Sequence, residues 1–341
     1  MRSSLVLLLF AGLVLAEGEG EAPVAKKRLR GLVEGKFVDE YFGIVYEAKG
    51  LAPGYGMGSG GQLFTGKGDD GVDIEISLQE SPQALTSAQW HDLLKRNWEK
   101  DGKKRIEIEH GSEPIFWSVY VEESLAGFKR HHAWRVFARG FQCFLVHAQV
   151  QEKTEHSGEQ LKQALGNFKI TAEKSDSLFA AHLVAKQQGI EPDAPAALLT
   201  AAALYTSQRG LENPALALKA ALLAEKHLDG FKPDDQWSLI HYRGLAELNL
   251  GANEESIPTW KRAIELAKGT ANAAESESNS RYNLTCAYAK LSRLDEAFAE
   301  LKLAFAAGVG EQVAKLKEWA KEDGDLEAMR KDPRWPELYP S

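Results

Sequence analysis

Hydrophobic and polar positions repeat with two different periods along the chain, and the period changes near residue 175. Before that point several segments alternate between apolar and polar residues, as at residues 72–78, which is typical of a strand with one buried face. After it, apolar residues recur every three or four positions, which is the period of an amphipathic helix. The pattern therefore predicts a sheet-containing domain followed by an all-helical domain.

The first domain, residues 36–172, is predicted to belong to the α+β class. Extended segments are expected at residues 42–46, 62–65, 72–78, 105–109, 115–122, 129–138 and 141–151. Helices are expected at residues 87–100 and 155–168, the first with Trp90, Leu93, Leu94 and Trp98 on one stripe. Short turns join the later strands, so these strands should form an antiparallel sheet that the helices cover.

The order of these elements resembles the PsbP-like fold. The similarity is carried by the opening Phe42-Gly43-Ile44 strand, which leads into Gly50-Leu51-Ala52-Pro53-Gly54, and by the closing Asn167-Phe168-Lys169-Ile170 segment. It covers most of residues 37–170 and rests on topology, without a diagnostic motif. The resemblance implies a binding or accessory domain.

Three hairpins of similar pattern follow in the helical half. The clearest runs from Tyr282 to Ala304, with small residues such as Ala297 where two helices would cross and large ones such as Leu301 beside them. Equivalent positions recur at intervals of 42 and 41 residues, namely Ala202, Gly244 and Thr285. This pattern resembles the tetratricopeptide repeat, whose period is about 34 residues. The excess is expected in loops between hairpins, at residues 229–235 and 269–278.

Two further segments are expected to cap the array, so that the helical domain spans residues 176–341. The first is an opening helix at residues 177–188. The second is the tail, where Asp325 to Trp335 looks like the closing motif of tetratricopeptide arrays in exported bacterial proteins. One hairpin cannot bury its apolar face alone, so the three hairpins should stack.

The tetratricopeptide resemblance also implies a binding site for a protein or peptide partner. In that family the first helices of successive hairpins line a groove that accepts an extended peptide or a helix. The positions of this sequence that match the groove positions are Thr206, Ser207, His241, Leu245, Asn249, Tyr282, Ala289 and Lys290. The alternative is that three repeats form only a shallow groove and that these side chains are merely solvated.

The N-terminus resembles a secretory signal peptide, with Arg2, an apolar stretch at residues 5–15 and Val14-Leu15-Ala16 before Glu17. Cleavage after Ala16 is expected, followed by a flexible arm at residues 17–35. The apolar stretch is shorter than the roughly 20 residues that a membrane span needs. A secreted or periplasmic protein that is not an integral membrane protein is therefore predicted.

Charge and motifs exclude several classes of function. The net charge of −8, without a long basic run, argues against a nucleic-acid partner. Cys143 and Cys286 both lie in apolar patterns, where buried free thiols are expected. The glycine-rich residues 54–61 precede an extended segment rather than a helix, so a phosphate-binding loop is not predicted. Hydrolase motifs are absent, and no catalytic residue, cofactor site or metal site is predicted.

The favoured function is a non-catalytic extracytoplasmic adaptor or scaffold that binds another polypeptide. Two alternatives stay open. A small-ligand or lipid-binding protein would have an apolar pocket in the sheet domain, lined by residues such as Trp117, Tyr120, Trp134 and Phe144. An enzyme with an unfamiliar site would bring together His110, His131, His132 and nearby acids with perturbed pKa values.

Overall fold

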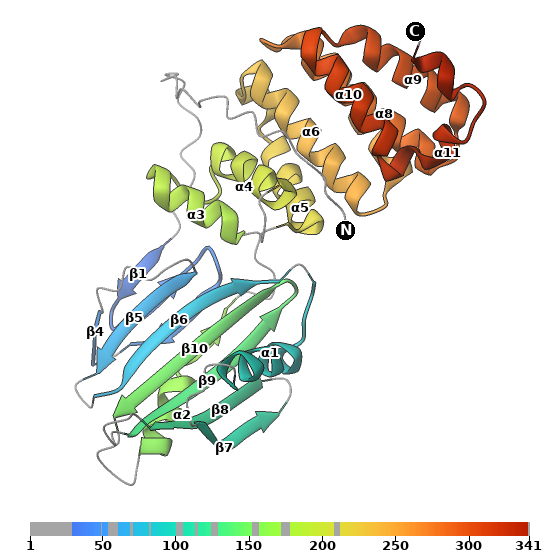
Figure 1. The fold of residues 1–341 in the computed structure, drawn as a ribbon. Helices are drawn as coiled ribbons and strands as arrows, with labels where there is room; N and C mark the ends of the chain where they lie inside the picture. The colour runs from blue at the N-terminus through green and yellow to red at the C-terminus, as the bar shows by residue number, and fades with distance from the viewer. Residues whose placement is uncertain are drawn as a thin grey trace. The chain divides into compact units, whose positions relative to one another are not determined.

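The computed structural model describes residues 29–339 with several internal gaps. The gaps are residue 49 and residues 54–60, 69–70, 82, 100–104, 113–114, 124–128, 152–156, 172–177 and 208–211. The chain divides into two compact units, Met1–Phe179 and Ala180–Ser341 (Figure 1). The first has the predicted α+β class and the second is helical, as predicted. The expected signal peptide and most of the glycine-rich segment lie outside the described residues.

The first unit contains two antiparallel sheets (Figure 1). The larger has seven strands in the order β4-β5-β6-β10-β9-β8-β7, and the smaller has four in the order β1-β2-β3-β11. The strands of the larger sheet are β4 (Leu51–Pro53), β5 (Gln62–Gly68), β6 (Asp73–Glu80), β7 (Arg105–Ser112), β8 (Ile115–Glu123), β9 (Lys129–Arg139) and β10 (Gln142–Gln151). Those of the smaller are β1 (Arg30–Val33), β2 (Lys36–Asp39), β3 (Ile44–Glu47) and β11 (Phe168–Ile170). The two helices are α1 (Ser87–Glu99) and α2 (Ser157–Gly166).

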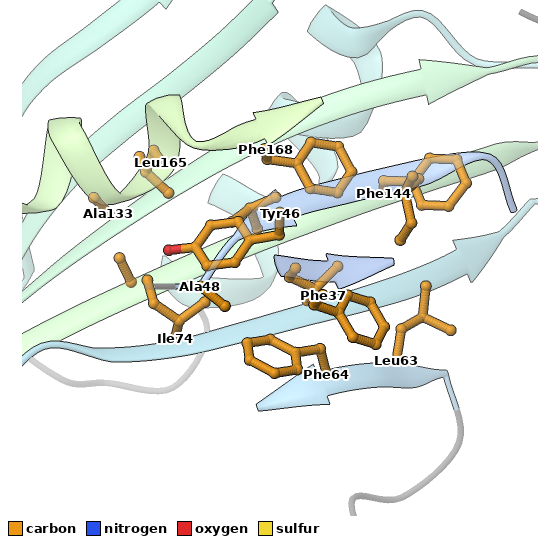
Figure 2. Close-up of a cluster of buried hydrophobic side chains, with 14 of the residues drawn as sticks. Phe37, Tyr46, Ala48, Leu63, Phe64, Ile74, Ala133, Phe144, Leu165 and Phe168 are labelled. Carbon is orange, nitrogen blue, oxygen red and sulfur yellow. The ribbon is translucent and has the colours of Figure 1, made fainter. Parts of the chain in front are cut away.

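Alternation along the central strands divides the first unit into two cores. On one face Phe144 and Val146 of β10 pair with Leu78 and Ile76 of β6 and pack with the smaller sheet and α2 (Figure 2). On the other face Leu145 joins a smaller core around α1, whose other buried members are Trp90, Trp134, Val136 and Cys143. Successive residues of one strand therefore belong to different cores.

Helix α1 begins at a capping box. The Thr86 hydroxyl accepts a hydrogen bond from the backbone N–H of Gln89 at 3.2 Å. In return, the side-chain oxygen of Gln89 accepts one from the backbone N–H of Thr86 at 2.9 Å. Such a reciprocal pair satisfies two backbone N–H groups that have no acceptor within the helix. The adjacent Ser87 hydroxyl accepts a bond from the amide of Ala138 in β9 at 3.1 Å. The cap thus also positions the start of α1 on the sheet.

The flexible arm predicted for residues 17–35 is wrong at its C-terminal end. β1 pairs with β2 as a hairpin in which Val33 lies opposite Lys36. The two residues between them, Glu34 and Gly35, both have positive φ, 49° and 75°. This is the geometry of a type I′ turn, which matches the natural twist of paired strands. The hairpin was not predicted from the sequence because glutamate is an unusual residue at the first position of such a turn.

The second unit consists of three helical hairpins with one helix before them and a folded tail after them (Figure 1). The hairpins are α4 (Pro195–Ser207) with α5 (Pro214–Glu225), α6 (Pro233–Asn249) with α7 (Asn253–Ala267), and α8 (Ala273–Lys290) with α9 (Leu294–Ala307). α3 (Phe179–Gln188) precedes them. The tail comprises α10 (Gly310–Glu322), the 3-10 turn η2 (Gly324–Leu326), α11 (Glu327–Arg330) and the 3-10 turn η3 (Trp335–Leu338). Every helix in the described part of the chain is too short or too polar to cross a bilayer.

The long loops expected between hairpins are largely helical instead. Residues 229–235 contain part of a 3-10 turn, η1 (Leu228–Gly230), and the start of α6, and residues 269–278 contain the start of α8. The extra residues relative to a tetratricopeptide repeat therefore lengthen the first helices, so that α6 has 17 residues and α8 has 18. Pro233 favours this start of α6, because proline fits the first turn of a helix, where its missing N–H is not needed.

The second hairpin depends on a close approach of its two helices at Gly244. A Cβ atom added at this position would lie 2.7 Å from two ring carbons of Trp260, which is completely buried on α7. The indole of Trp260 cannot easily move away, because a buried side chain is packed on all sides. Glycine is therefore required here for packing, although it is a poor helix former.

Replacing Gly244 by alanine is expected to lower the free energy of unfolding of the helical unit by about 1–2 kcal/mol. Overlap in a filled core costs about 1–3 kcal/mol, which outweighs the helix preference of alanine over glycine. Chemical denaturation and hydrogen exchange in α6 and α7 would measure the loss. Gly230→Ala is the matched control, since nothing lies within 4 Å of a Cβ there, and an equal loss in both variants would contradict the packing argument.

Candidate partner-binding site

The eight predicted contact residues lie on the first helices of the three hairpins, α4, α6 and α8. These helices are neighbours, since α6 contacts both α4 and α8. We call this set the first-helix face; its members are Thr206, Ser207, His241, Leu245, Asn249, Tyr282, Ala289 and Lys290. The three helices contribute to it in different ways.

The part on α4 consists of two half-buried hydroxyls at the end of the helix. Thr206 Oγ1 donates to the carbonyl oxygen of Ala202 at 2.7 Å, and Ser207 Oγ donates to that of Ala203 at 2.9 Å. Their protons are therefore used within the helix. Because a hydroxyl oxygen also carries lone pairs, both groups can still accept a hydrogen bond.

The part on α6 is a row of three residues spaced one helical turn apart: His241, Leu245 and Asn249. Residues four apart lie on the same side of a helix, about 6 Å from one another along its axis. Leu245 is half-buried and Asn249 is exposed. The row therefore offers an aromatic ring, an apolar side chain and an amide in sequence.

His241 is held as a neutral ring between aromatic neighbours. Its ring centroid lies 4.8 Å from that of Trp237 and 5.2 Å from that of Trp260. Burial lowers the pKa of His241 to about 4. Nδ1 is buried without a hydrogen-bond partner among the described residues. Because a buried unpaired N–H costs more than an unpaired acceptor, the favoured tautomer carries its proton on Nε2.

The part on α8 is covered by the tail of the chain itself. Tyr282 and Ala289 are buried, and the Tyr282 hydroxyl donates to the Asp323 carboxylate at 2.8 Å. Lys290 Nζ lies 3.0 Å from the Asp325 carboxylate. Burial raises the pKa of Tyr282, and the nearby Asp323 adds to the effect. Tyr282 and Lys290, which were expected to contact a partner, contact the turn before α11 in this structure.

Two of the residues expected to line a pocket in the sheet domain lie in separate cores. Phe144 belongs to the larger core beside α2, and Trp134 belongs to the smaller core beside α1. They therefore do not line one cavity. The side chains of Trp117 and Tyr120 lie outside the described part of the structure.

Two histidines of the sheet domain, His132 and His147, meet in a stack that was not predicted from the sequence. The rings of His132, Trp134 and His147 are stacked, with 4.4 Å between the centroids of Trp134 and His147. His132 Nδ1 and His147 Nε2 are 3.1 Å apart and share a hydrogen bond. Burial, with smaller contributions from His132 and Arg130, lowers the pKa of His147 to about 3. Among the described residues no three His, Cys, Asp or Glu side chains gather as metal ligands.

A serine and a histidine also meet beneath α1. His91 Nε2 hydrogen bonds to the Ser118 hydroxyl, and His91 Nδ1 lies 3.8 Å from a carboxylate oxygen of Asp92. The order resembles a nucleophile, a base and an acid. Ser118 is buried, with only 1% of its surface exposed, and the separation from Asp92 exceeds a hydrogen bond. The contact therefore attaches α1 to β8 and gives a substrate no access to the serine.

Comparisons with known proteins find similarity only to solved structures. No protein-family model matches the chain, and no curated protein does. The cyanobacterial PsbP protein (CyanoP) of Synechocystis shares 12% identity, with 44% of this chain and 99% of that chain covered and a TM-score of 0.32. The Ran-binding protein Mog1p of Saccharomyces cerevisiae shares 13%, with 38% and 90% covered and a TM-score of 0.30. A protein of Bacteroides thetaiotaomicron shares 11%, with 63% and 78% covered and a TM-score of 0.29. These scores are too low to support any statement about the function of this chain.

Proposed function

We propose that this protein is an exported, non-catalytic binding protein that holds another polypeptide on its first-helix face. The observation that carries the proposal is the row His241, Leu245 and Asn249 on α6. His241 carries its N–H on Nε2 in the tautomer favoured by the unpaired, buried Nδ1, Leu245 is half-buried, and Asn249 is exposed. Side chains that repeat about every 6 Å along one helix can be contacted together by a single short peptide segment.

The binding area centres on α4 and α6. On α8, Tyr282 and Lys290 are engaged with the tail, so a partner meets them only if the tail moves. The half-buried hydroxyls of Thr206 and Ser207 supply acceptors on α4, the helix that neighbours α6. The partner therefore meets donors on α6 and acceptors on α4, which is the pairing that a peptide main chain needs.

Photo-crosslinking from position 245 is expected to capture a polypeptide partner. A photoreactive phenylalanine analogue replaces Leu245 in the full chain, and crosslinks are collected from the cell envelope and identified by mass spectrometry. The control carries the analogue at Leu222, an exposed residue of the second helix α5. A partner captured from 245 and absent from 222 supports the proposal; identical crosslinks from both positions contradict it.

Export is tested on the same material. The chain recovered from the envelope is expected to begin at Glu17, after removal of residues 1–16. The N-terminal peptide, identified by mass spectrometry, measures this directly. An intact N-terminus in a chain that stays in the cytoplasm would remove export from the proposal and leave the binding site untouched.

A further inference from the structure

The row on α6 has an equivalent on α8 that already holds a polypeptide segment. Each member lies 41 residues before its counterpart, so His241, Leu245 and Asn249 correspond to Tyr282, Cys286 and Lys290. In both rows a hydrogen-bond donor stands at each end and an uncharged, less polar side chain stands between them. The second row therefore shows what such an arrangement binds in this molecule.

The α8 row holds an acidic turn. Tyr282 donates to the carboxylate of Asp323 at 2.8 Å, and Lys290 pairs with the carboxylate of Asp325 at 3.0 Å. Cys286 Sγ lies between them, 3.8 Å from the Asp323 carboxylate. The turn is fixed internally, because the other oxygen of Asp323 accepts a bond from the Asp325 amide at 2.9 Å. Two carboxylates spaced two residues apart thus meet the donors at the two ends of the row.

The α6 row also has a hydrogen-bond donor at each end. His241 is neutral with its proton favoured on Nε2, and Asn249 ends α6 with an exposed amide. Neither side chain makes a hydrogen bond or an ion pair with any described residue, whereas both end members of the α8 row do. The amide takes the place of the ammonium group of Lys290, so a carboxylate would be bound more weakly here than on α8.

We propose that the partner segment bound by α6 is an acidic turn with two carboxylates spaced as Asp-X-Asp, held as α8 holds the Asp323–Asp325 turn. The inference rests on the proposed function and specifies its ligand. One carboxylate accepts the His241 N–H, the other accepts the Asn249 amide, and the residues between them pass over Leu245. A segment without acidic residues would offer these two donors only neutral acceptors. Its hydrogen bonds would be weaker, because charged acceptors form the stronger hydrogen bonds.

The test uses the chain's own turn as a probe in trans. A synthetic peptide of residues 321–331 is titrated into the full-length protein and its Kd is measured by calorimetry, beside a peptide in which both aspartates are asparagine. Asn249→Lys recreates the ammonium group found on α8 and is expected to tighten binding about fivefold, whereas Asn249→Asp is expected to weaken it about fivefold. Asn249 is exposed at a helix end, so neither change disturbs the fold.

Three outcomes would overturn the inference. Asn249→Lys could fail to bind the acidic peptide at millimolar concentration, or the acidic and amide peptides could bind equally. Lys290→Ala, rather than the Asn249 variants, could change the affinity, which would mean that the peptide only exchanges with the tail on α8. If crosslinks from position 245 still capture a partner in any of these cases, the proposed function stands and only the acidic turn is rejected.

Discussion

Replacing Arg243 by methionine is expected to lower the free energy of unfolding of the helical unit by about 3 kcal/mol. Arg243 Nε donates to Glu247 at 2.8 Å and Nη1 donates to Glu225 at 2.8 Å, which ties α6 to α5. The Glu247 side chain is only 5% exposed, and it would keep its charge without a partner. Removing one member of a buried ion pair costs about 3–5 kcal/mol, and the partial exposure of Arg243 puts the loss at the lower end. Denaturant unfolding followed by tryptophan fluorescence would measure it.

A double variant distinguishes the cost of leaving the Glu247 carboxylate unpaired from the cost of losing the packing of the Arg243 side chain. In Arg243→Met with Glu247→Leu no unpaired carboxylate remains at position 247, and Glu225 keeps its contact with Arg262. Most of the stability is therefore expected to return. A double variant as unstable as Arg243→Met would show that the guanidinium acts through its packing on the neighbouring helix, and that the buried charge matters little.

The helical hairpins could be predicted because their signals are local. Small residues such as Gly244 mark a helix crossing, and large ones such as Trp260 fill it, within about 20 positions of one another. The ends of the first helices could not be predicted as well. Residues 273–278 are mostly polar and suggested a loop, yet Ser276, Ser278 and Ser280 are buried in α8. Ser278 donates to the carbonyl oxygen of Ala304 on α9, so tertiary contacts determine where that helix starts.

The places of the candidate residues on the first helices could be read from the sequence, whereas the contacts that each side chain makes could not. Alignment of the repeats placed His241 and Tyr282 at equivalent points, because a 41-residue interval is visible in the sequence. That Asp323 binds Tyr282 depends on how the tail folds back over a separation of 41 residues, and no periodic pattern encodes it. Residues engaged with the tail and residues open to a partner therefore look alike in the sequence.

The stack in the sheet domain could have been found from strand register. The turn at Gly140 and Phe141 leaves Arg139 opposite Gln142, and counting back from this pair places Trp134 opposite His147. Directly opposed residues point to the same face, so their rings must meet. Only the depth of burial, and hence the pKa of His147, required the three-dimensional structure.

Lowering the pH from 6.5 to 4 is expected to destabilise the sheet domain by about 2–3 kcal/mol through His147 alone. The pKa of His147 is about 3 in the folded state and about 6.5 when the chain is unfolded, so the unfolded chain binds more protons between these values. The stabilisation is fully present above pH 6.5 and is lost as the pH falls toward 3. Hydrogen exchange of β9 and β10 at several pH values would measure it.

His147→Gln distinguishes this effect from general acid unfolding. The amide can still hydrogen bond to His132, and it does not titrate, so the stability of β9 and β10 should depend less steeply on pH between 6.5 and 4. His131→Gln, at a half-buried position next to His132 on the same strand, is the matched control for the change of histidine to glutamine. Equal slopes in wild type and His147→Gln would mean that the imidazole is not held neutral by burial in the stack with Trp134.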